Sequence, residues 1–314
     1  EILPKMTRLT TLDLRDTRMD ESDCYAVACA LKILSSLMSL SLSDNKFGED
    51  GHEELAASLQ HLSHLRVLQI SNIGLSPEAA AQVVDAINIT RSVELLDDIP
   101  VARFGDGTTY ELNLNRLRLH PPEGAMISAL LSTRLPPLVT LDIRYNFLGD
   151  GGGIALASCM PLLKTLRTVK LWNNEFGEEG SCALASAMRE LTGLECLHMC
   201  GSKLGSKGGK ALSQSMQGLS GLTALRLWRC ELGAEGCCAL AEALDHMTSL
   251  TLLDVGHNHS GEEGSEALCT HVQHLRNLTE LDLTGNLLVT RGGLALSESL
   301  QKIASIKNLK LMGC

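Results

Sequence analysis

The sequence predicts an α/β solenoid, built from strand–helix units of 28 residues that stack along the chain. Two observations predict this fold. Apolar positions recur in one register from Leu9 to Ile306, and each period has two halves with different apolar spacing. Units of this length cannot bury a core alone, so a periodic chain stacks each unit on its neighbours.

The register follows the pattern L-x-x-L-x-L-x-x-N-x-φ-G, in which φ is apolar. Successive units begin at steps of 28, 28, 44 and 29 residues, followed by six steps of 28. The first positions of the units are Leu9, Leu37, Leu65, Thr109, Leu138, Leu166, Leu194, Leu222, Leu250, Leu278 and Ile306. Chance does not hold one register for so long, and we expect a single solenoid over residues 1–314.

Each unit divides into a strand half and a helix half. LVTLDI, from Leu138, alternates apolar with other residues, as a half-buried strand does. GEEGSCALASAMREL, from Gly177, places Leu184, Met188 and Leu191 at helical spacing. Stacked units of this kind form a horseshoe, with a parallel sheet on the concave face and helices on the convex face.

One step is irregular. The 44-residue step holds 16 extra residues within SVELLDDIPVARFGDGTTY, residues 92–110. This segment is polar and rich in turn-forming residues. It is either a degenerate repeat or ornamental loop, or a protruding loop that binds or regulates.

Composition narrows the class of protein. The chain is 44% apolar with a net charge of −10, and it holds no apolar run near the roughly 18 residues of a membrane span. Eleven cysteines without a C-x-x-C spacing favour free thiols in a reducing cytoplasm. The sequons at Asn88 and Asn277 leave a secreted protein open as the alternative. Because Glu1 lies within the repeat pattern and is not preceded by a methionine, we expect a fragment of a longer chain.

No catalytic motif occurs, so we expect neither an enzyme nor a cofactor. GSKGGKA, from Gly205, lacks the spacing of a phosphate-binding loop. The pairs His61 with His64 and His271 with His274 lie three residues apart on helices. Neither pair has a carboxylate at ligand spacing in the sequence, so we expect no metal site.

A second set of ligand-type residues lies on one strand. Cys196, His198 and Cys200 alternate and therefore point the same way. Three residues along one strand are too far apart to close on one ion. We expect surface side chains here.

The concave face carries the strongest functional signal. In each unit the third, fifth, seventh and eighth positions face outward. The chain's two tryptophans, Trp172 and Trp228, share the seventh position two units apart, which predicts a ring separation of about 10 Å. Cys200 and Gly201 lie between them. The candidate binding residues around them are Arg144, Tyr145, Lys170, Trp172, His198, Arg226, Trp228, Arg229 and His257.

Tryptophan, tyrosine and arginine are the residue types enriched where binding energy concentrates. We therefore expect a ligand or partner surface with a basic, aromatic centre. The alternative is that the indoles only cover the sheet, with arginines stacked on them.

We expect the partner to carry acidic groups. The outer columns hold aspartates that would repel such a partner and fix its position; they are Asp13, Asp16, Asp44, Asp254 and Asp282. Nucleic acid is disfavoured because a chain of charge −10 attracts phosphate weakly. We expect no membrane contact.

The repeat resembles the ribonuclease-inhibitor type of leucine-rich repeat over nearly the whole chain. The segments NNEFG and GEEGSCALA are similar to the C-terminal repeats of NOD-like receptors, which are cytosolic innate immune sensors. This resemblance implies a cytoplasmic domain that senses a protein or microbial ligand, or that holds the receptor inactive by contact with upstream domains of the parent chain. It also implies that the asparagine of each repeat bonds loop backbone along the stack. Ile73 and Leu117, which flank the irregular step, cannot do so.

Two other functions remain open within this repeat class. One is a GTPase-activating protein of the Ran type, which would use a loop residue such as Arg116 or Arg229. The other is a ribonuclease-inhibitor-like blocker of a basic enzyme. The acidic net charge favours the inhibitor, and the basic central surface argues against it.

Overall fold

The protein is seen in a computed structural model that describes residues 6–314. Glu1, where we expected a fragment to begin, lies outside the described residues. The chain divides into two compact units: unit 1 comprises Glu1–Thr109 with Pro122–Pro136, and unit 2 comprises Tyr110–Pro121 with Pro137–Cys314. The expectation of one solenoid over residues 1–314 stays a prediction.

Unit 1 holds a parallel sheet of four strands in chain order. The strands are β1 (Thr11–Asp13), β2 (Ser39–Ser41), β3 (Val67–Gln69) and β4 (Leu95–Leu96). The helices are α1 (Glu21–Leu31), α2 (Glu49–Leu59), α3 (Pro77–Thr90), the 3-10 helix η2 (Val101–Phe104) and α4 (Pro121–Arg134), whose first residue belongs to unit 2. Asp20 and Ser76 cap α1 and α3 by accepting a backbone N–H from three residues further on.

Unit 2 holds a parallel sheet of eight strands, again in chain order. They are β5 (Glu111–Asn113), β6 (Thr140–Asp142), β7 (Thr168–Lys170), β8 (Cys196–His198), β9 (Ala224–Arg226), β10 (Leu252–Asp254), β11 (Glu280–Asp282) and β12 (Asn308–Lys310). The helices are α5 (Gly149–Cys159), α6 (Glu178–Ala187), α7 (Gly205–Met216), α8 (Gly233–Leu244), α9 (Gly261–His271) and α10 (Thr290–Leu300). Short 3-10 turns extend three of them: η3 (Met160–Leu162), η4 (Met188–Glu190) and η5 (Val272–His274).

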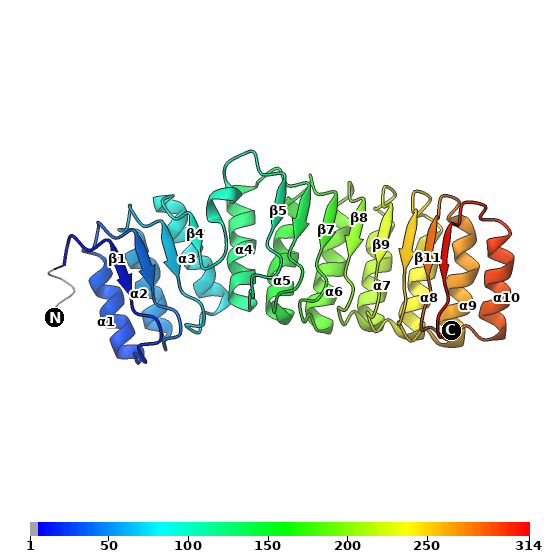
Figure 1. Cartoon of the computed structure of the whole chain (residues 1–314), viewed down its shortest axis with the longest axis horizontal. Coiled ribbons are helices and arrows are strands. Elements are labelled where there is room, and N and C mark those ends of the chain that lie inside the picture. Colours follow the sequence, from blue (N-terminus) through cyan, green and yellow to red (C-terminus); the bar gives the residue numbers. More distant parts are fainter. Residues whose placement is uncertain (1–5) are drawn as a thin grey trace. The chain divides into compact units, whose positions relative to one another are not determined.

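Within each unit the sheet forms one layer and the helices form the other (Figure 1). The leucines of the repeat fill the space between the layers; Leu166, Leu197 and Leu225, for example, are fully buried. This arrangement confirms the predicted stack of strand–helix units. No helix among residues 6–314 combines the length and the apolar character needed to cross a membrane.

Buried asparagines join neighbouring turns of the stack. The Asn146 side-chain amide donates to Leu114 O at 2.9 Å and to Ile143 O at 2.8 Å, while its Oδ1 accepts from Leu119 N at 3.1 Å. The same bonds, to backbone carbonyls of their own repeat and of the preceding repeat, are donated by Asn45, Asn174, Asn258 and Asn286. Each side chain thereby satisfies buried backbone groups that the short strands leave unpaired.

The irregular step contains a strand that the sequence pattern did not reveal. The repeat pattern predicts eleven strands, and residues 6–314 form twelve, because β4 pairs with β3 at the regular offset of 28 residues, Val67 with Leu95. The extra residues follow β4. Val101 and Phe104 of the 3-10 turn are fully buried, so much of this segment packs into unit 1.

Asp97 explains why β4 pairs with β3 over only two residues. Its carboxylate Oδ1 accepts from the backbone N–H groups of Ile70 and Ser71 at 2.7 and 3.0 Å. These bonds occupy donors of the chain that leaves β3. Burial raises the pKa of Asp97 to about 6, against the opposing effect of these hydrogen bonds.

Candidate functional site

The candidate residues of unit 2 lie on adjacent strands in a fixed register. The strand pairs align Asp142 with Lys170, Lys170 with His198, His198 with Arg226, and Arg226 with Asp254. In β7, β8 and β9 the first and last residues are half-buried, and the central residue is buried. The fifth-position column predicted from the period is therefore a real row of side chains on the outer surface of the sheet, which we call the strand face.

Trp172 belongs to a cluster of stacked rings and cations just beyond β7. Its ring centroid lies 4.5 Å from that of Tyr145 at an interplanar angle of 56°. The guanidinium of Arg144 lies 5.4 Å from the Trp172 ring, and that of Arg116 lies 4.5 Å from the Tyr145 ring. Such contacts stabilise by about 0.5–1 kcal/mol each at exposed sites and hold the rings in place.

Trp228 forms a second cluster two strands away. Arg229 lies 4.2 Å from its ring, and His257 meets it edge-on with centroids 5.4 Å apart. Gly256 makes room for the indole, because a β-carbon there would lie 2.8 Å from Cδ1 of Trp228. Both tryptophans are half-buried, while Leu171 and Leu227 beside them are fully buried. Both indoles therefore lie on the strand face and outside the leucine interior.

The eighth-position residues have a left-handed backbone. Arg116, Tyr145, Arg229 and His257 have φ between 54° and 59°. Residues other than glycine, asparagine and aspartate seldom adopt this conformation. The turn that ends each strand therefore fixes the direction in which these side chains leave the backbone.

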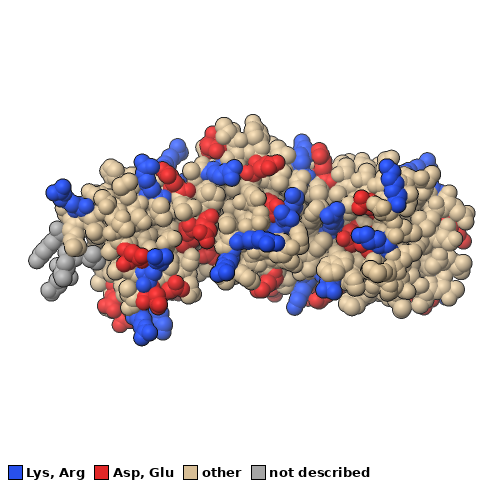
Figure 2. All heavy atoms as spheres, viewed as in Figure 1, with Lys and Arg blue, Asp and Glu red and all other residues tan. Residues whose placement is uncertain are grey.

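The electrostatics of the strand face are mixed. Asp142, with a side chain only 7% exposed, pairs with Arg144 at 2.7 Å and lies 3.9 Å from Lys170. At the other end of the face, Lys310 lies 3.2 Å from Asp282. Figure 2 likewise shows basic and acidic side chains side by side on the visible face. A partner therefore meets local charge pairs as well as cations.

His198 is neutral at physiological pH. Burial lowers its pKa to about 4, and the nearby cations Arg226, Lys170 and Arg144 act in the same direction. Its Nε2 lies 3.1 Å from Cys196 Sγ. His198 therefore offers hydrogen-bonding capacity to a partner, and the positive charge of the face comes from lysine and arginine.

The sulfur atoms beside His198 are thiols. Burial raises the pKa of Cys196 and raises that of Cys200 to about 11, so neither supplies a thiolate at neutral pH. All eleven cysteines are free. Cys196 and Cys200 are half-buried on the strand face, as Trp172 and Trp228 are.

One hollow on the strand face is small and is lined by neither indole. It encloses about 150 Å³ between β9 and β12, lined in part by Arg226, Asp254, Asp282 and Lys310. Small-molecule sites usually enclose about 300–1,000 Å³. The strand face therefore suits an extended or protein partner better than an enclosed small molecule.

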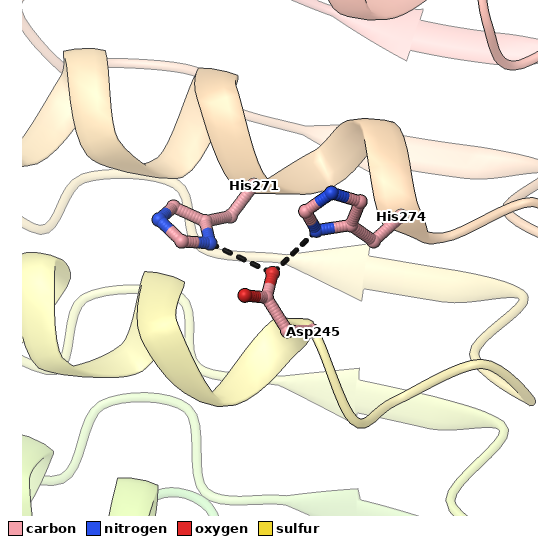
Figure 3. Close-up of side chains that lie close together, drawn as sticks. All are labelled: Asp245, His271 and His274. Carbon is pink, nitrogen blue, oxygen red and sulfur yellow. Dashed lines mark hydrogen bonds and ion pairs between the residues drawn. The ribbon is translucent and has the colours of Figure 1, made fainter.

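The helix face brings together side chains that sequence spacing kept apart. His271 and His274 have no carboxylate at ligand spacing in the sequence, but Asp245 of the preceding repeat contacts both rings (Figure 3). Sequence spacing within one helix does not reveal a ligand contributed by the neighbouring turn of the stack. Two further contacts also join neighbouring repeats: Arg116, which the sequence offered only as a loop residue of a GTPase-activating protein, lies over Tyr145, and Asp142 lies 3.9 Å from Lys170.

Comparison with known proteins agrees with this architecture. A family model described as "Leucine Rich repeat" matches residues 34–56, 134–157 and 274–297. These three segments are leucine-rich repeats, and the strand–helix repeat described above continues between them. Among solved structures it is similar to an internalin from Listeria monocytogenes at 17% identity, over 98% of this chain and 88% of that one, with a TM-score of 0.38. No curated protein sequence matches it.

Leucine-rich-repeat domains are protein-interaction scaffolds, and the repeats of this chain have that architecture. The match does not distinguish subtypes of the repeat. The ribonuclease-inhibitor type and the similarity to NOD-like receptors remain interpretations of the sequence.

Proposed function

We propose that the strand face of unit 2 binds a protein segment that carries carboxylate groups. One observation carries the proposal: the strand register sets two half-buried indoles, each with a guanidinium against its ring, on the same face. The core does not require either indole, since Leu171 and Leu227 already fill the interior beside them. Large aromatic side chains held at a surface in this way are typical of binding hot spots.

The arrangement suits a short extended peptide. The strands that precede Trp172 and Trp228 are separated by β8, so about 10 Å lies between them. Three residues of an extended chain span about that distance. An apolar side chain of the peptide would pack between the rings, and its carboxylates would meet Lys170, Arg226 or Arg229.

The charge distribution also suggests where the partner is excluded. Asp254 and Asp282 follow Arg226 along the same row. Carboxylates of the partner would be repelled there, which places the acidic part of the segment over β7 to β9. Burial raises the pKa of Asp254, so its repulsion increases as the pH rises.

At the level of the whole protein, we propose the role of a ligand-sensing domain in a cytoplasmic NOD-like receptor. Support comes from the similarity of the NNEFG and GEEGSCALA segments to the repeats of those receptors. In this role the bound segment is either a ligand or an internal domain of the parent chain. A ligand with higher affinity for the open state would displace the internal contact and shift the population towards that state.

The site is directly observable because Trp172 and Trp228 are the only tryptophans in the chain. We would titrate the protein with synthetic peptides of about ten residues, about 33 Å when extended, that alternate acidic with apolar side chains. Binding should change the tryptophan emission and weaken as salt is added. Replacing both tryptophans by alanine should weaken binding at least about 30-fold, as expected for loss of a hot spot worth about 2 kcal/mol.

For the double variant, binding is followed by calorimetry, since its indoles are gone. The matched control is Lys207→Ala with Arg291→Ala, which removes two cations of the helix face whose side chains are 81% and 70% exposed. The control should bind as the wild type does. Equal affinity of acidic peptides for the tryptophan variant, or equal affinity for their Asn/Gln counterparts, would refute the proposed site. The receptor role has a separate test, namely whether the full-length gene encodes a nucleotide-binding domain before residue 1.

A further inference from the structure

Three metal-ligand side chains meet on the helix face of unit 2, away from the strand face. Nδ1 of His271 lies 2.7 Å from Oδ1 of Asp245, and Nδ1 of His274 lies 2.5 Å from the same oxygen (Figure 3). One ligand atom from each residue lies within 4.8 Å of the other two. Among residues 6–314, no other group of three or more His, Cys, Asp or Glu side chains meets this condition.

Local structure explains how the residues meet. Asp245 is the C-cap residue directly after α8, and His271 is the last residue of α9. After His271 the chain tightens into the 3-10 turn η5, which ends at His274. In a 3-10 turn the side chains at positions i and i+3 lie one above the other. Both imidazoles therefore face Asp245 in the preceding repeat, and their ring centroids lie 6.1 Å apart.

Two imidazole nitrogens and one carboxylate oxygen form a common donor set for zinc, and sites with three protein ligands leave a fourth position open. In the present structure the single oxygen of Asp245 receives both Nδ1 atoms. Zn²⁺ would move these atoms apart, because Zn–N and Zn–O bonds of about 2.0–2.2 Å require the donor atoms to be about 3.3 Å apart. That separation requires only small side-chain movements from the distances observed. Each neutral imidazole would then carry its proton on Nε2 and present the lone pair of Nδ1 to the ion.

We propose that Asp245, His271 and His274 form a binding site for Zn²⁺ or a chemically similar divalent transition-metal ion. The ion would take Nδ1 of each histidine and Oδ1 of Asp245, with water in the fourth position. Since the ligands come from two successive repeats, the bound ion links the end of α8 to the end of α9. The ligand side chains are 27% to 46% exposed, so the site is open to solvent.

Another histidine pair of the chain shows what the site requires. His61 occupies the place in its repeat that His274 occupies here, four residues before the next anchor leucine. The place equivalent to Asp245 is then held by Lys32, which pairs with Glu54. Nδ1 of His64 donates a hydrogen bond to the backbone oxygen of Ser35 at 3.1 Å. The same histidine spacing therefore lacks a carboxylate partner in unit 1 and provides a control within the molecule.

Nearby cations limit the expected affinity. Arg276 and Lys302 line the same shallow hollow as His274. Their charge opposes a second cation, and the open position favours exchange. We therefore expect binding in the micromolar range, about 20-fold or more weaker than in closed structural zinc sites.

The experiment is a calorimetric titration of the full chain with ZnCl₂, in a Cys29→Ser/Cys314→Ser background that removes the two exposed thiols. Co²⁺ absorption provides a second readout, because nitrogen and oxygen ligands without thiolate give weak d–d bands and no strong sulfur charge-transfer band. We expect one ion per chain. Asp245→Asn should reduce the affinity at least about 10-fold, since loss of even an outer partner of a ligand costs about 10–100-fold. Asp245→Asn keeps the side-chain shape and can still accept a hydrogen bond.

His61→Gln with His64→Gln is the matched control, and His271→Gln with His274→Gln is the test pair. The control should bind the ion as the background protein does, whereas the test pair should lose the high-affinity event. Circular dichroism melts report whether each variant is folded. Unchanged stoichiometry and affinity in a folded test pair, or an equal loss in the control pair, would overturn the site and leave Asp245 as a hydrogen-bond acceptor only.

Discussion

The buried asparagines make a quantitative prediction about stability, and Asn258 is the clearest case. Its side chain is fully buried. The amide donates to Leu227 O at 2.8 Å and to Val255 O at 2.9 Å, and Oδ1 accepts from Cys230 N at 2.9 Å. Asn258→Ala would remove these three bonds and two longer ones, from Leu232 N at 3.4 Å and to Gly256 O at 3.2 Å.

The expected loss follows from the number of orphaned groups. A buried polar group without a partner costs about 1–3 kcal/mol. The carbonyls keep a second lone pair for other partners, so their cost lies at the low end. We expect a loss of about 3–5 kcal/mol in the free energy of unfolding, a large part of the roughly 5–15 kcal/mol of a typical domain.

The assay is urea unfolding of the full chain followed by tryptophan emission, with Asn277→Ala as the control. Asn277 is exposed and donates one bond, to Thr248 O at 2.8 Å. Its loss should cost no more than about 1 kcal/mol. If Asn258→Ala lost no more stability than Asn277→Ala, the idea that these side chains hold neighbouring units together would be wrong.

Two further predictions concern stability. Because burial raises the folded-state pKa of Asp97 from 3.8 to about 6, the folded protein binds more protons than the unfolded chain between those values, and stability falls as the pH rises through this window. Asp97→Asn should therefore gain stability relative to the wild type from about pH 4 to pH 6, by up to about 3 kcal/mol, and a pH-independent difference in urea midpoints would contradict this. Gly209→Ala would place a β-carbon 2.9 Å from Cα of Gly236 in the next helix, whereas at the equivalent Gly293 it would meet nothing within 4 Å. Thermal melts should show a loss of about 1–3 kcal/mol for Gly209→Ala and a gain of about 0.5–1 kcal/mol for Gly293→Ala; the same sign for both would argue against close helix packing as the cause.

Most of the strand–helix order could be predicted from the sequence, because the apolar period records which side chains enter the core. The exception is β4. Its unit begins at Val93 and continues to Leu96, but Asp98 occupies the next apolar position of the pattern. The strand ends there because the Asp97 carboxylate accepts the backbone N–H groups of Ile70 and Ser71 in the preceding repeat. A polar side chain that replaces a strand's hydrogen bonds leaves no apolar signal.

The candidate site, too, could be predicted from the sequence only in part. The period alone was enough to place Trp172 and Trp228 on one face, since each position of the repeat has a fixed direction. It could not show which side chains pair across units. Arg116 lies over the ring of Tyr145 in the next repeat, and Asp245 contacts two histidines of the repeat that follows its own. Those pairings depend on rotamers and on the way a helix ends.

The backbone at the strand ends gives an independent reason to regard the strand face as functional. The eighth position is left-handed in unit after unit, and Gly201, Gly285 and Gly313 adopt it without steric cost. Tyr145, Arg229 and other large residues adopt it too, although a left-handed conformation costs a residue with a β-carbon about 1–2 kcal/mol. The fold itself would be served by glycine at each of these places. The large side chains lie on the two indole clusters, so the strain occurs where the proposed partner would bind, as strained backbone often does at functional sites.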